Sequence, residues 1–86
     1  MENTTPRIFS QVLKKIYELL PEDLANKLNE KSKYWAPELC WNMLSQFLND
    51  NITPSASDEN SVRIYAVLCN MTEKEMREAF RVNGDL

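Results

Sequence analysis

The side chains that most often carry enzymatic catalysis are scarce in this sequence. It contains no histidine, which removes the commonest general base and the commonest metal ligand. It contains one glycine in 86 residues, so it holds neither a G-x-x-x-x-G-K-S/T nor a G-x-G-x-x-G phosphate-binding loop. Acid pairs such as Asp58 with Glu59 are present, but paired carboxylates support acid–base catalysis only where a cleft desolvates one of them. We therefore predict that the protein is not an enzyme, and we expect no cofactor and no small-molecule substrate.

Two cysteines, Cys40 and Cys69, are the remaining candidates for metal binding or thiol chemistry. They stand 29 positions apart, each inside an apolar run, whereas zinc-binding cysteines usually come in closely spaced pairs. A zinc site would also need two carboxylates to complete four ligands. The sequence therefore predicts no metal site, and it favours two buried free thiols over a disulfide.

Large aromatic side chains gather in one short stretch. Tyr34, Trp35 and Trp41 lie within eight residues of one another, and such aromatic residues dominate both small cores and the hot spots of protein interfaces. One interpretation places Trp41 in the core and Trp35 over the end of a helix. The other makes the three residues a binding surface for a protein partner or a second copy of the chain. Because the segments 37–50 and 58–70 carry more apolar surface than five short helices readily enclose, the binding surface is our leading hypothesis.

Three basic side chains indicate an alternative function. Lys74, Arg77 and Arg81 fall within about 60° of one another on a helix, away from its apolar positions, and such a stripe can reach DNA phosphates or base edges. Against this, the i,i+4 pairs Glu73–Arg77 and Lys74–Glu78 would neutralise the helix surface. The net charge of −3, from 10 basic and 13 acidic residues, also opposes DNA binding.

Residues 62–81 resemble a helix-turn-helix, the pair of helices by which many regulators read DNA. Ala66 stands where the two helices touch, Asn70 and Met71 stand in the turn, and Thr72 caps the second helix. The family usually has glycine where this chain has Asn70, and asparagine tolerates the left-handed conformation better than most residues. The resemblance implies that the second helix reads DNA, which we keep as the alternative to protein binding.

Proline positions, apolar periodicity and capping residues predict the elements that position these side chains. Five helices and no sheet are expected, over residues 6–20, 21–31, 37–50, 58–70 and 72–83. Thr5 and Pro6 are expected to start the first helix. Thr72 and Glu75 are expected to form a capping box at the start of the last helix, and Gly84 to end it.

The two most apolar segments are 37–50 and 58–70. In the first, apolar residues cover about half of the helical wheel, which predicts a central helix packed on two sides. The second is rich in β-branched residues and taken alone could be a strand, but no partner strand is present, so we predict a buried helix. Residues 52–60 between them are the one long stretch of turn-forming residues and are predicted to be a mobile loop.

Length and composition place these helices in one small domain, residues 1–86. The sequence begins with no charged-then-apolar signal and has no apolar run of about 18 residues, so we expect a cytoplasmic protein that does not enter a membrane. The sequence thus predicts an all-α module that binds another macromolecule, as small regulators, adaptors and inhibitors do. A protein partner or homodimer is the first expectation and DNA is the second.

Overall fold

The computed structural model describes residues 8–82, and within that range every regular element is helical. The helices are α1 (Phe9–Leu19), α2 (Glu22–Ser32), α3 (Cys40–Asn51), α4 (Glu59–Cys69) and α5 (Glu73–Val82), and a short 3₁₀ turn, η1 (Pro37–Leu39), precedes α3. The predicted all-α fold with five helices is confirmed. None of the helices in residues 8–82 is long and apolar enough to cross a membrane.

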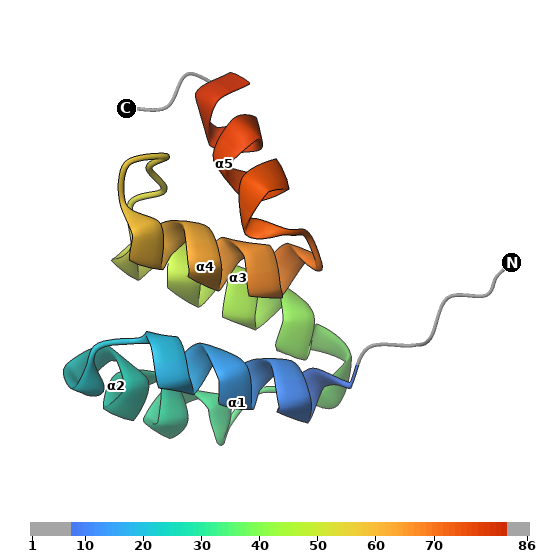
Figure 1. Ribbon diagram of the computed structural model, residues 1–86. Helices are drawn as coiled ribbons and strands as arrows, with labels where there is room; N and C mark the ends of the chain where they lie inside the picture. Colours follow the sequence, from blue (N-terminus) through green and yellow to red (C-terminus); the bar gives the residue numbers. More distant parts are fainter. Residues whose placement is uncertain (1–7, 83–86) are drawn as a thin grey trace, which may run out of the picture.

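The five helices pack into three groups along the molecule. In Figure 1, α1 and α2 lie together at one end, α3 and α4 occupy the middle, and α5 rises steeply from the C-terminal end of α4. Helix α4 contacts both α1 and α5, and α2 contacts α3. The arrangement leaves the α2–α3 side and the α4–α5 side as two separate surfaces.

The start of the first helix lies later than predicted. Ile8 is extended, with φ −95° and ψ 115°, so α1 begins at Phe9. The predicted start at Thr5 and Pro6 lies outside the described residues, as does the predicted stop at Gly84.

The start of the third helix is also later than predicted. Pro37 opens the 3₁₀ turn η1, and the α-helix begins only at Cys40. The Leu39 N–H donates to the Ala36 carbonyl at 2.9 Å, an i→i+3 bond that closes a tighter turn than an α-helix has.

Two helix starts are capped by side chains. Asp58 Oδ1 accepts hydrogen bonds from the backbone N–H groups of Asn60 at 3.1 Å and Ser61 at 3.4 Å. The Glu75 N–H donates to Thr72 Oγ1 and the Thr72 N–H donates to Glu75 Oε1, each at 3.0 Å. These bonds satisfy backbone donors that have no partner within the helix, so the predicted capping box is confirmed.

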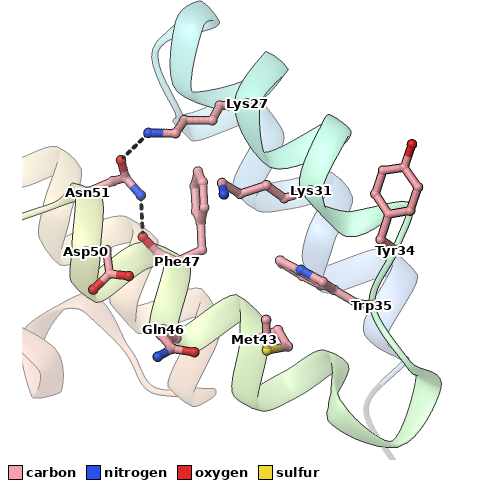
Figure 2. A pocket seen from close by; sticks show the side chains of 9 residues that line it. All are labelled: Lys27, Lys31, Tyr34, Trp35, Met43, Gln46, Phe47, Asp50 and Asn51. Carbon is pink, nitrogen blue, oxygen red and sulfur yellow. Dashed lines mark hydrogen bonds between the residues drawn. The ribbon is translucent and has the colours of Figure 1, made fainter.

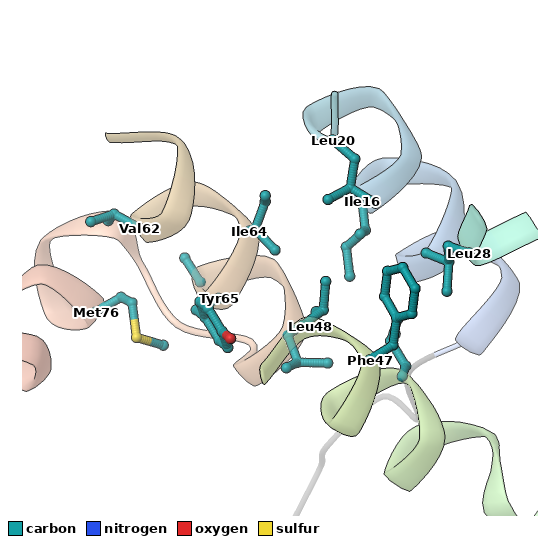
Figure 3. Close-up of a cluster of buried hydrophobic side chains, with 12 residues drawn as sticks. Ile16, Leu20, Leu28, Phe47, Leu48, Val62, Ile64, Tyr65 and Met76 are labelled. Carbon is teal, nitrogen blue, oxygen red and sulfur yellow. The ribbon is translucent and has the colours of Figure 1, made fainter. Parts of the chain in front are cut away.

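The core is built around α4. Six residues of α4 are buried, compared with three of α3, so α4 rather than the predicted segment 37–50 is the central helix. A helix that is apolar around most of its circumference must be covered from more than one side, and α1 and α5 both cover α4. Figure 3 shows the cluster, which consists of Ile16, Leu20, Leu28, Leu44, Phe47, Leu48, Val62, Ile64, Tyr65, Ala66, Leu68 and Met76.

A buried serine ties the loop between α3 and α4 to the first turn of α4. Ser61 is 1% exposed, and its hydroxyl lies 3.1 Å from the Ser55 carbonyl oxygen and 2.9 Å from that of Asp58. The same hydroxyl accepts from the Ser55 N–H at 3.2 Å. Residues 59 and 60, which the predicted loop 52–60 shares with the predicted helix 58–70, belong to α4. The mobility of the segment 52–60 stays a prediction.

Tyr65 connects three helices. Its hydroxyl donates to Asn49 Oδ1 of α3 at 2.9 Å, and its ring meets that of Phe80 on α5 edge-on, with centroids 5.8 Å apart. Burial, and to a smaller extent the charge of Cys69, raises the pKa of Tyr65 to about 12. The phenol therefore stays protonated near neutral pH and remains a donor to Asn49.

Candidate functional site

The three predicted aromatic residues do not form one patch. Tyr34 is 84% exposed, and Trp35 beside it is half-buried and packs against the core cluster. Trp41 is also half-buried, and its ring meets the Phe9 ring edge-on with centroids 5.0 Å apart. Trp41 therefore packs toward α1, and the structure brings together only Tyr34 and Trp35.

Tyr34 and Trp35 line a groove between α2 and α3, which we call the α2–α3 groove. Its volume is about 580 Å³, within the range of roughly 300–1,000 Å³ that is usual for binding pockets. Figure 2 shows its lining residues, which are Lys27, Lys31, Tyr34, Trp35, Met43, Gln46, Phe47, Asp50 and Asn51. The groove therefore combines apolar side chains with charged and amide groups.

The end of α2 places the aromatic pair at the mouth of this groove. The Tyr34 N–H donates to the Lys31 carbonyl at 3.2 Å, and the Trp35 N–H donates to the Ser32 carbonyl at 3.3 Å. These two bonds form a turn directly after Ser32, the last residue of α2. Pro37 follows and begins η1, so the connection is too short for the two rings to move far from α2 and α3.

The charges of the groove are divided between its two helices. On α2, Lys27 Nζ donates to Asn51 Oδ1 at 3.4 Å, and the Asn51 amide donates in turn to the Phe47 carbonyl at 2.8 Å (Figure 2). Lys31 stands one helical turn further along α2, while α3 supplies Asp50. Within residues 8–82 neither lysine forms an ion pair with a carboxylate. Lys27 and Lys31 cannot be recognised as site residues from the sequence alone, because their i,i+4 spacing marks a site only when α3 packs beside α2.

The basic stripe predicted on α5 is partly engaged by ion pairs with α4. Arg77 Nη2 donates to the two carboxylate oxygens of Glu59 at 2.7 and 2.8 Å, and Arg63 Nε lies 3.8 Å from Glu73 Oε1. The predicted Glu73–Arg77 pair within α5 is therefore wrong. Each of these residues has its partner on α4 instead, because the packing of α5 on α4 brings the charged groups together across the two helices.

The other two residues of the stripe remain at the surface. Lys74 and Arg81 are exposed. In the described part of the chain no ion pair joins Lys74 to Glu78, so that predicted pair is not present. Of the three basic residues, Arg77 is thus neutralised by Glu59, while Lys74 and Arg81 are exposed to solvent.

The turn between α4 and α5 has the conformation that the sequence indicates. Asn70 is left-handed, with φ 57° and ψ 47°. The Met71 N–H donates to the Ala66 carbonyl at 2.9 Å and the Asn70 N–H donates to the Val67 carbonyl at 3.4 Å, which are the two bonds of a Schellman motif. Ala66 is buried. These features describe the turn alone, and both the helix-turn-helix arrangement and a DNA-reading role for the pair stay predictions.

The two cysteines are both free, as predicted, but they are not both buried. Cys40 is half-buried and Cys69 is exposed, because Cys69 is the last residue of α4 and lies next to the turn to α5. Among residues 8–82 no three cysteine or carboxylate side chains gather closely enough to hold a metal ion.

Comparison with known proteins assigns neither a family nor a function to the chain. No protein-family model, no curated protein and no solved structure matches the chain. Only the sequence and the geometry of the chain itself therefore bear on its function.

Proposed function

We propose that the protein is a small, non-enzymatic protein-binding module of regulatory, adaptor or inhibitor type, and that the α2–α3 groove is its contact surface. The observation that carries this proposal is the position of Tyr34, 84% exposed, beside a groove of about 580 Å³. An exposed tyrosine next to a half-buried tryptophan is typical of interface hot spots, because such rings bury much area with few rotatable bonds. A cytoplasmic location fits the two free cysteines.

The proposal predicts that Tyr34→Ala weakens binding of the partner by about tenfold or more. Tyr34 is almost fully exposed, so the substitution removes contact area without disturbing the core. The measurement is quantitative affinity capture from the cells that produce the protein, followed by titration of the captured partner against the wild type and the variant. Lys74→Ala, an exposed position on α5, is the control and is expected to bind as the wild type does. Equal capture by Tyr34→Ala and the wild type would contradict the proposal.

A second copy of the chain is the other form of protein partner. Sedimentation equilibrium of the wild type distinguishes the two forms. If the wild type is a dimer that Tyr34→Ala dissociates, the groove is the interface between two copies of the chain. If the wild type is a monomer at high concentration, the proposed partner is a different protein.

DNA binding through α5 is the second candidate, and the exposure of Lys74 and Arg81 beyond a Schellman turn favours it. This candidate predicts retardation of duplex DNA that falls with added salt and is abolished by replacing both residues with alanine, because each removes a phosphate contact. Arg77→Ala is expected to reduce the retardation of DNA only slightly, since Arg77 is already paired with Glu59. No retardation at low salt would exclude the candidate.

A further inference from the structure

The α2–α3 groove has two unlike ends, and this difference constrains what fits it. Figure 2 places Tyr34 and Trp35 at one end, with Met43 below Trp35, and places Lys27 and Asp50 at the other end near Asn51. The first end is aromatic and apolar, and the second is polar. An occupant that fills the groove therefore needs an apolar side chain at one end and polar groups toward the other.

The two lysines give the α2 side of the groove a positive charge. Lys27 and Lys31 stand four residues apart on α2, a rise of about 6 Å along the helix. The neighbouring Lys33 is paired with Glu30 at 3.3 Å, whereas within residues 8–82 no carboxylate pairs with Lys27 or Lys31. Lys27 has only a 3.4 Å bond to the Asn51 amide oxygen, which a carboxylate could replace with a stronger, charge-assisted bond.

The apolar end offers surfaces that can adapt to a side chain. Trp35 and Met43 are half-buried, so part of each faces the groove. Methionine fits partners of varied shape because its side chain is unbranched and polarisable. The position of Tyr34 at the mouth adds an aromatic face with an exposed hydroxyl.

We infer that the occupant of the α2–α3 groove is an acidic amphipathic segment of a partner protein, with an apolar side chain against Trp35 and Met43 and two carboxylates about 6 Å apart at Lys27 and Lys31. This inference rests on the proposed function and adds the chemistry of the partner. Complementary charge carries it, since two lysines against the single carboxylate of Asp50 leave the groove positive on a chain whose net charge is −3.

The test uses the full chain and a display library of random peptides. Peptides that bind the wild type are selected, synthesised with a fluorescent label, and titrated by fluorescence anisotropy. We expect the selected peptides to combine an apolar residue with two or more Asp or Glu residues. Lys27→Gln/Lys31→Gln is expected to weaken their binding about tenfold, and Lys33→Gln, the matched control on a paired lysine, is expected to leave it unchanged.

A double-mutant cycle then isolates the contact between charges. Changing the carboxylates of the peptide to amides is expected to weaken binding to the wild type as much as the lysine substitutions do. The two losses are expected not to add, because each removes the same interaction. Circular dichroism verifies that each variant keeps the helical content of the wild type.

Each result that contradicts the acidic partner also shows whether the groove remains a protein-binding surface. Peptides whose binding depends on Tyr34 but ignores the lysine substitutions would overturn the acidic partner and leave the groove as a protein-binding surface. Failure to select any peptide whose binding depends on Tyr34 would overturn both proposals. A dimer in sedimentation that Tyr34→Ala dissociates would assign the groove to a second copy and overturn the acidic partner.

Discussion

Leu48→Ala is expected to lower the free energy of unfolding by about 2–5 kcal/mol. Leu48 is 0% exposed and belongs to the core cluster, to which all five helices contribute (Figure 3). Truncation removes buried methyl groups and leaves a cavity, because close-packed neighbours relax only in part. A small domain has a total stability of roughly 5–15 kcal/mol, so this loss is a large part of the whole. Urea unfolding followed by tryptophan fluorescence and far-UV circular dichroism measures it.

Leu39→Ala is the matched control, since it makes the same chemical change at a residue that is 46% exposed. It is expected to cost less than about 1 kcal/mol, because part of the leucine already faces water and little cavity can form. If the two variants unfold at the same urea concentration, the core does not lie where the structure places it.

Asn70→Val is expected to cost about 2 kcal/mol. Asn70 has φ 57°, and a β-branched residue is strongly disfavoured in this region by contact between its side chain and the backbone. Asn70→Gly is expected to be as stable as the wild type or slightly more so, because glycine adopts positive φ without that contact. The measurement is again urea unfolding.

Asn42→Val is the control for this second series. Asn42 is exposed within α3, and asparagine and valine have similar helix propensities, so the substitution is expected to change stability by less than about 0.5 kcal/mol. Equal stability of Asn70→Val and Asn42→Val would contradict the left-handed turn.

Local signals in the sequence are sufficient for the helices and for the capping box of α5. The capping box of Thr72 and Glu75 spans four residues, and its hydrogen bonds form as soon as the first turn of α5 forms. Asp58 caps α4 in the same way. The left-handed turn followed similarly from Asn70 between two apolar helical patterns.

Contacts between helices could not be predicted from the same signals. The i,i+4 rule paired Glu73 with Arg77, yet each found a partner on α4, where Arg63 and Glu59 stand 10 and 18 positions away in the sequence. Exposed ion pairs differ by only a few tenths of a kcal/mol. The packing of α5 on α4, rather than spacing along α5, therefore selects the partners.

The candidate site divides in the same way. The cluster of aromatic residues in the sequence correctly predicts that Tyr34 and Trp35 lie together. It also includes Trp41, which is near them in sequence but packs toward α1. The side-by-side packing of α2 and α3 brings Lys27, Lys31 and Met43 into one groove, and no periodicity within one helix predicts that arrangement.

Residue types and local spacing are enough to predict the helical class, the number of helices and their approximate ends, and they show that the chain has no histidine and no glycine-rich phosphate-loop motif. These properties depend on residue type and on contacts within a few positions along the chain. Only the packing of the helices shows that α4 is central, that Arg77 is neutralised by Glu59, and that a groove with one aromatic end and two lysines lies between α2 and α3. Those features arise from apolar burial among distant segments, which many residues share and which no single local pattern specifies.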